Sequence, residues 1–427
     1  MIMKKIIYVF VLIIIALSIM FSFALPINAM AEGEADNTTY ELFVNFVTNC
    51  PNRTVATDNE LTAASYIAAI LETYGYGVAA DMIEPFDFLE KVSLFYSQID
   101  EVEQSSQNVV AYKRSANPDA KLMVIGTHYG NLAGRPLTTT TVIGGEGAYD
   151  NGTGVAALLA IASNLSAVEL SFDIAFVFFG AELLDNAGSY AFIEQNSQEI
   201  LGMINLVGVG GGDNLYAYYD EMKRSHGTFI DKIISDNDIN ILPAPSNRNL
   251  ILDTAQTIFP YSHKGLDSSN AVFIENGIPS VNIFGYNWGG ILASESATKP
   301  NISGKGSDTL ENFIDMYGET AIRTKLNTVV NFVTLTVQEE GLQQTFETAL
   351  SDNRYDNLTS DIVRKILKWA MLIGLAIALG VLSSRANRIT RNAPPTITAD
   401  SSDNTETNIE SQSEDKTEKE DDIFNEF

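Results

Sequence analysis

Short, uninterrupted apolar runs alternate with amphipathic stretches through the middle of the chain. Five runs rich in β-branched and aromatic residues predict buried strands, at residues 108–112, 121–127, 171–180, 203–209 and 279–284. Apolar positions at helical spacing predict helices at residues 62–74, 154–165, 189–196, 226–235 and 310–340. This order of strands and helices predicts an α/β domain, with a doubly wound, mostly parallel sheet covered by helices on both faces.

The amino-terminal pattern is that of an export signal. Lys4 and Lys5 precede a long apolar stretch that ends near the small residues 29–31, and we expect a signal peptide over residues 1–31. An uncleaved signal anchor is the alternative, because the apolar stretch is long for a signal peptide. In either case the part that follows is exported, and we assign residues 32–360 to one domain.

A second apolar segment lies near the carboxyl end. The 16 residues between Lys368 and Arg385 carry no charge, against roughly 20 residues in a spanning helix, and flanking basic side chains can extend such a segment by snorkelling. We therefore predict a transmembrane helix with basic flanks over residues 362–385, with a buried core helix as the alternative. Residues 392–427 are strongly acidic and nearly free of apolar positions, which predicts a disordered tail.

These segments together predict the location of the protein. An export signal followed by one stop-transfer helix gives a single-pass membrane protein, whose main domain is extracytoplasmic and whose acidic tail is cytoplasmic. The membrane is then the first expected partner.

Composition narrows the classes of function. The chain has 427 residues, 54 acidic against 26 basic, and a formal charge of −28, so nucleic acid is excluded as a partner by repulsion from its phosphates. A single cysteine excludes an intrachain disulfide framework and a cysteine-rich metal site. Three histidines limit any histidine-dependent metal site to a few ligands.

Polar residues that follow predicted strands are the candidates for chemistry, because the carboxyl ends of parallel strands form the ligand-binding edge of such sheets. His128 and Glu182 each follow a strand, and Asp150 lies in a glycine-rich turn that leads into a helix. An imidazole and a carboxylate form a common zinc-ligand pair, and a second carboxylate can activate metal-bound water. Each residue also has a structural explanation, as a loop histidine, a helix cap or a solvated strand end.

Six segments around these residues occur in the order and spacing of a known family. They are Asn108-Val109-Val110-Ala111, Ile125-Gly126-Thr127-His128, the glycine-rich segment 147–156, Phe176 to Glu182, Ile204-Asn205-Leu206 and Gly277-Ile278-Pro279. The sequence resembles the M28 peptidases, a family of zinc-dependent exopeptidases that includes glutaminyl cyclases, over roughly residues 62–335. The resemblance implies a doubly wound sheet. It also implies that His128 is a ligand of one zinc, that Asp150 bridges two zincs, and that Glu182 is the general base.

The chain departs from this family at other metal positions. Leu183, Val207 and Gly304 stand where the family has zinc ligands, and Gly130 stands where it has the aspartate that holds the ligating histidine. A catalytic zinc needs about three protein ligands and an open position. Hydrocarbon side chains cannot meet the charge of the ion, so we predict that the dinuclear site does not form and that no cofactor is bound. Zinc is expected only if the site is functional.

Three hypotheses for function follow. The first is a catalytically inactive, membrane-anchored pseudopeptidase used in peptide or protein binding or in scaffolding. The second is an active zinc aminopeptidase with a rebuilt, single-metal site made of His128, Asp150 and one further residue from the set His263, Asp267, Asp185, Asp213 and Glu146. The third is a receptor for a peptide or an exported partner, where the acidic body favours cationic ligands. The aromatic segment 286–290 is placed either to line a groove for a peptide end or to pack on the sheet edge.

Overall fold

An eight-stranded mixed sheet is the centre of the computed structural model. The structure describes residues 35–94, 98–131, 136–137, 140–141, 145–219, 225–244, 268–286, 302, 305–351, 369–370 and 373. The strands follow the order β1 (Ile83–Leu94), β2 (Gln98–Lys113), β6 (Asp173–Phe179), β3 (Leu122–His128), β7 (Ile200–Val207), β10 (Ser280–Tyr286), β8 (Asn214–Tyr219) and β9 (Leu242–Pro243). A separate two-stranded sheet is formed by β4 (Pro136–Leu137) and β5 (Thr140–Thr141).

The centre of the large sheet is parallel and its margins are mixed. The four strands β6, β3, β7 and β10 run parallel to one another, whereas β2 pairs antiparallel with β6 and β8 pairs antiparallel with β10. Central strands that are buried on both faces read as continuous apolar runs, and every residue of β3 and β6 is buried. All five predicted strands are therefore present.

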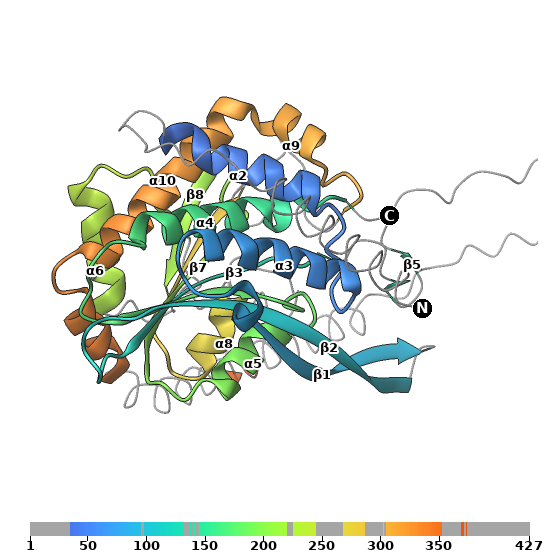
Figure 1. Ribbon diagram of the computed structural model, residues 1–427, viewed down its shortest axis with the longest axis horizontal. Helices are drawn as coiled ribbons and strands as arrows, with labels where there is room; N and C mark the ends of the chain where they lie inside the picture. The colour runs from blue at the N-terminus through green and yellow to red at the C-terminus, as the bar shows by residue number, and fades with distance from the viewer. Residues whose placement is uncertain are drawn as a thin grey trace, which may run out of the picture. The chain divides into compact units, whose positions relative to one another are not determined.

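Helices cover both faces of the sheet (Figure 1). One face carries α2 (Ala35–Asn49), α3 (Asp58–Thr73), α4 (Thr153–Leu165) and α10 (Glu319–Gln338), and the other carries α5 (Ala187–Gln195) and α8 (Ser269–Glu275). The remaining elements are α6 (Ser225–Asp236), α9 (Leu310–Tyr317) and two short segments, η1 (Ala79–Met82) and η2 (Ala148–Gly152). The predicted α/β domain with a central sheet is thus confirmed.

One predicted helix is in fact two. The apolar pattern over residues 310–340 is interrupted at Gly318, whose φ of 81° is in the region that favours glycine, so α9 ends before it and α10 begins after it. The prediction of a single helix there is wrong. Periodicity continues across the break because both helices pack an apolar face on the same core.

The chain divides into two compact units, Met1–Lys368 and Trp369–Phe427. In the second unit the structure describes only Trp369, Ala370 and Ile373, which are helical and exposed. Within the portions of the chain that are described, no helix is both long enough and apolar enough to cross a membrane. The predicted signal over residues 1–31, most of the predicted transmembrane helix over residues 362–385 and the acidic tail over residues 392–427 lie outside these portions.

Candidate functional site

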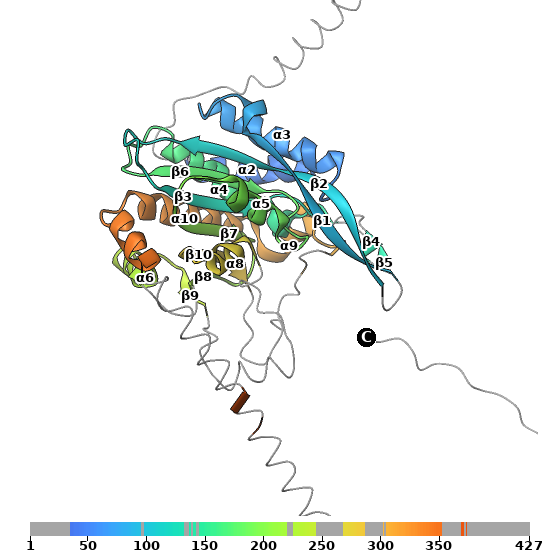
Figure 2. The ribbon, with the colours of Figure 1, turned by 90° about the horizontal axis from the view of Figure 1, so that it is seen from below.

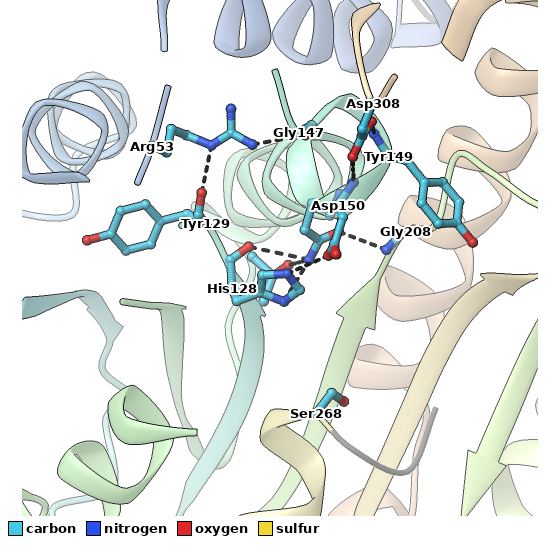
Figure 3. A network of polar contacts seen from close by, with 12 residues as sticks. Arg53, His128, Tyr129, Gly147, Tyr149, Asp150, Gly208, Ser268 and Asp308 are labelled. Carbon is cyan, nitrogen blue, oxygen red and sulfur yellow. Dashed lines mark hydrogen bonds and ion pairs between the residues drawn. The ribbon is translucent and has the colours of Figure 1, made fainter. Parts of the chain in front are cut away.

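The predicted site residues meet at one edge of the sheet. His128 is the last residue of β3 and pairs in register with Phe179, the last residue of β6, so Glu182 follows close beside it. Asp150 lies in η2, the segment that leads into α4. The side chains of His128 and Asp150 face each other, with Asp308 above them in Figure 3. The structure therefore brings together the residues that the sequence singled out.

His128 and Asp150 are hydrogen-bonded directly. The distance from His128 Nε2 to Asp150 Oδ1 is 2.8 Å, and the histidine side chain is buried. Two ligands that share a zinc in tetrahedral geometry, each at roughly 2.0–2.1 Å from the ion, lie about 3.3 Å apart. The observed separation is that of a hydrogen bond between the two side chains.

Asn151 supports the segment that carries His128. Its Oδ1 accepts the N–H groups of Gly154 and Gly208, at 3.2 and 2.7 Å, and this fixes the orientation of the amide. Its Nδ2 donates to Thr127 Oγ1 at 2.7 Å and to the carbonyl oxygen of Leu206 at 3.0 Å. Asp150 is a carboxylate and can only accept, so His128 Nε2 is the donor in the contact between the two side chains.

Glu182 is held by the start of α5. Ser189 donates to it twice, from its backbone N at 3.0 Å and from its Oγ at 2.7 Å, so both carboxyl oxygens are engaged. Burial raises the pKa of Glu182, and the hydrogen bonds from Ser189 oppose the shift. A buried carboxyl with a raised pKa suits proton transfer, but here its oxygens are committed to the fold.

A second carboxylate fills the space beside Gly130. Glu60, in the first turn of α3, is fully buried and accepts the N–H groups of Ala181 and Ala56 and the hydroxyl of Ser106, at 2.8, 2.7 and 2.8 Å. A Cβ atom at Gly130 would lie 2.7 Å from Glu60 Oε1. The position thus tolerates only glycine while Glu60 keeps these bonds.

Arg53 joins the segments behind the site. Its guanidinium is fully buried and donates to the carbonyl oxygens of Cys50, Tyr129, Glu146 and Gly147, at 2.6, 2.6, 2.9 and 2.9 Å. Burial lowers its pKa to about 10, so it stays charged at neutral pH. Figure 3 shows Arg53 reaching both Tyr129, directly after His128, and Gly147, at the start of the turn that carries Asp150.

Asp308 supports the same turn from the other side. Its Oδ1 accepts the N–H of Tyr149 at 2.7 Å, and its Oδ2 accepts the N–H of Asp150 at 3.1 Å. Burial raises the pKa of Asp308 to about 7, and the charge of Asp150 acts in the same direction, against the two backbone hydrogen bonds and Arg53. Asp308 is therefore partly protonated near neutral pH.

This raised pKa predicts a pH-dependent stability. The folded protein holds a proton on Asp308 that the unfolded chain has already released at the ordinary value of 3.8, so the free energy of unfolding decreases as the pH rises through 7 and is greatest at lower pH. We expect Asp308 to contribute a decrease of about 1.6 kcal/mol between roughly pH 5.5 and pH 7. Urea unfolding at several pH values, with Asp308→Asn as the reference that lacks this ionisation, measures the contribution. Equal slopes for the two proteins would contradict it.

The comparison with protein-family models identifies the family. The model of peptidase family M28 matches residues 108–333, which include all three retained site residues. The chain belongs to peptidase family M28. A search of curated proteins gave no match.

Solved structures confirm the fold of this M28 chain. BSAP, a zinc aminopeptidase from Bacillus subtilis, is 15% identical with a TM-score of 0.52, and the match covers 70% of this chain and 93% of that one. An aminopeptidase from Aneurinibacillus sp. strain AM-1 is 16% identical with a TM-score of 0.51, over 71% and 96%. A glutaminyl cyclase from an Acidobacteriales bacterium is 15% identical with a TM-score of 0.50, over 74% and 98%.

The donor set of this M28 chain does not fit the zinc pair implied by its family. Leu183 and Val207 are partly buried beside Glu182 and at the end of β7, where the resemblance places carboxylate ligands. Gly304, at the third replaced position, lies outside the described residues. Within the parts of the chain that the structure describes, no three histidine, cysteine or acidic side chains are grouped to hold a metal ion.

Three of the five residues considered for a rebuilt site are described by the structure. Glu146 Oε2 accepts the N–H of Leu310, at the start of α9, at 2.7 Å, and both Asp185 and Asp213 are exposed. His263 and Asp267 lie outside the described residues, as does the aromatic segment after Tyr286.

Sequence reasoning did not single out Arg53, Glu60 or Asn151 for the site. Asn151 stands next to Asp150 in the family motif, and this adjacency was a usable signal. Arg53 and Glu60 lie far from the motifs in sequence and reach the site through long-range contacts. No local pattern distinguishes them from solvated charges.

Proposed function

We propose that this M28 chain is a membrane-anchored, extracytoplasmic peptidase-like protein that binds a peptide or protein partner without hydrolysing it. The observation that supports the proposal most directly is the contact of His128 with Asp150. The two side chains bond to each other, and the neighbouring ligand positions carry Leu183 and Val207. A two-residue donor set falls short of the roughly three protein ligands of a catalytic zinc.

The residues that remain have structural roles, which accounts for their retention without catalysis. His128, Asp150 and Glu182 each hydrogen-bond to a neighbouring element, so the edge of the sheet stays ordered without an ion. A folded, polar edge at the carboxyl ends of β3 and β6 is where α/β sheets bind ligands. We expect the partner to be cationic, because the chain carries 54 acidic residues against 26 basic ones.

The membrane anchor and the orientation are part of the same proposal and rest on the sequence. Residues 1–31 have the order of a signal peptide, and residues 362–385 have the order of a stop-transfer helix. External protease added to intact cells or spheroplasts should digest the main domain and leave the acidic tail over residues 392–427 intact. Protection of the main domain would contradict this topology.

Metal analysis and turnover test the loss of catalysis. The full chain, purified in detergent and dialysed against micromolar zinc, should contain far less than one zinc per chain by mass spectrometry of the metal. It should release no amine from aminoacyl-p-nitroanilides above the rate of Glu182→Gln, the control variant that removes the base. Stoichiometric zinc together with turnover that stops on Glu182→Gln would overturn the proposal.

The alternative is a working zinc aminopeptidase with a rebuilt, single-metal site. It is favoured by one observation, that His128, Asp150 and Glu182 still lie together. A third ligand from the region of His263 and Asp267 would complete it. In that case His263→Ala or Asp267→Ala would remove bound zinc, whereas both variants leave the non-catalytic protein unchanged.

A further inference from the structure

An open groove lies between the start of α3 and the hairpin of β1 and β2. Figure 2 shows α3 lying beside β2, and the far end of the hairpin projecting past the other strands. The groove encloses about 520 Å³, within the roughly 300–1,000 Å³ of ligand-binding pockets. Its lining comes from three segments, at residues 56–61, 80–85 and 105–107.

Apolar side chains form one part of this lining. Leu61, near the start of α3, is 44% exposed, and it lines the groove together with Ala80, Ile83 and Pro85. Ala80 and Pro85 are exposed as well, and Ile83 is partly buried. Single exposed apolar residues are ordinary on a protein surface, whereas a group of them in one hollow marks a place where a partner can bury them.

Buried hydrogen bonds hold the walls of the groove in place. Glu60 accepts the N–H of Ala56 and the hydroxyl of Ser106, at 2.7 and 2.8 Å, and so ties the start of α3 to β2. Gln107, also in the lining, is buried and donates to the hydroxyl of Tyr129 at 2.7 Å. The groove is therefore formed before a partner binds, and binding requires little further ordering of this chain.

The charge of the groove is negative. The three segments that line it contain four acidic residues and no lysine or arginine. Asp58 and Asp81 are exposed, and so is Asp87, which accepts the hydroxyl of Ser105 in the lining at 2.6 Å. Arg53, the nearest basic residue along the chain, is fully buried and donates to four carbonyl oxygens, so it offers no cation at this surface. The rim is therefore complementary to positive charge.

We propose that this groove binds a peptide segment of a partner protein in which an aliphatic side chain stands between lysine or arginine residues. The aliphatic side chain enters the hollow beside Leu61, and the basic side chains pair with Asp58 and Asp87. A second copy of this chain is a poor occupant, because its formal charge of −28 is repelled by the same rim. The proposal rests on the proposed function in taking a peptide as the partner, and it does not depend on whether the edge with His128 binds zinc.

The test is the binding of short synthetic peptides to the full chain in a non-ionic detergent, measured by fluorescence anisotropy. The probe is a labelled seven-residue peptide with one leucine between two arginines and with glycine and serine at its ends. Its two controls carry glutamate in place of both arginines, or serine in place of the leucine. The probe should bind more tightly than either control and should lose affinity as salt is added. Absence of binding, or equal binding of the glutamate control, overturns the proposal.

Variants at exposed side chains, which should leave the fold intact, locate the binding surface. Asp58→Asn should weaken binding roughly threefold, and Leu61→Ala about fivefold, because they remove a charge of the rim and an apolar contact. Leu242→Ala, at a side chain that is 41% exposed on β9, is the matched control and should leave the affinity unchanged. If Asp185→Asn, close to Glu182, weakens binding and Asp58→Asn does not, the partner binds at the edge of the sheet. That result overturns this proposal and leaves the proposed function intact.

Photo-cross-linking gives the position directly. A benzoylphenylalanine in place of the leucine of the probe should attach to residues 56–61 or 80–85, and mass spectrometry of the digested chain identifies the attachment site. Cross-links that are confined to other segments contradict the proposal. Zinc content and turnover, measured on the same preparation, decide the loss of catalysis separately, so the failure of one proposal is distinguished from the failure of the other.

Discussion

Replacement of Arg53 by methionine is expected to lower the free energy of unfolding by about 3–5 kcal/mol, the cost typical of removing one partner from a buried charged network. The side chain is 0% exposed, and its guanidinium satisfies four backbone carbonyl oxygens on three segments of chain. Methionine fills similar volume but donates no hydrogen bond, so these carbonyl groups lose their partner in a place that water does not reach. Urea unfolding of the wild-type and variant chains measures the difference.

The matched control is Arg114→Met. Arg114 also donates to an acceptor, Asp173 at 2.8 Å, but its side chain is 55% exposed. The same chemical change there should cost about 1 kcal/mol or less, because water replaces the lost donor. Arg53→Lys keeps the positive charge but loses the geometry of the guanidinium, since a single ammonium cannot reach four carbonyl oxygens in different directions. If Arg53→Met were as mild as Arg114→Met, the network would not be what joins the segments behind the site.

Restoring the family aspartate at Gly130 is expected to destabilise the protein by about 3 kcal/mol or more. A Cβ atom there would lie 2.7 Å from Glu60 Oε1 and 2.8 Å from Val55 Cγ1, so the site is overpacked before the rest of the side chain is added. The new carboxylate would also lie beside the buried carboxylate of Glu60, and like charges in a buried site repel strongly. Gly130→Ala adds only the steric conflict. The difference between the free energies of unfolding of Gly130→Ala and Gly130→Asp therefore measures the effect of the added charge.

A double-mutant cycle tests whether Glu60 is the cause. Glu60→Ala alone should be destabilising, because Ala181, Ala56 and Ser106 lose their acceptor. In the double variant with Gly130→Asp, the Glu60→Ala change frees the space for the aspartate. The loss of unfolding free energy in the double variant should therefore be smaller than the sum of the two single losses by about 1 kcal/mol or more. Simple additivity would show that Glu60 does not exclude a side chain at Gly130, and the loss of the aspartate would need another explanation.

The buried part of the fold was predictable because burial leaves a local pattern. All residues of β3 and β6 are buried, and each reads as a continuous apolar run. The part of the β1 and β2 hairpin that precedes residue 108 was missed because it carries no continuous apolar run, and residues 87, 89 and 101–103 are exposed. Helix α2 was also missed. The break at Gly318 escaped the periodic pattern because a single residue of special φ leaves the apolar spacing on either side nearly unchanged.

The sequence by itself determined the α/β class, the family, and the positions of His128, Asp150 and Glu182 at the carboxyl edge of the sheet. It also determined which ligand types are missing, since Leu183 and Val207 can be read directly. Only the tertiary structure decided how the retained residues are used. His128 bonds to Asp150, and Glu60 fills the space beside Gly130 from helix α3. The physical reason is range: apolar periodicity is local in sequence, whereas hydrogen bonds to buried polar groups join residues that only folding brings together.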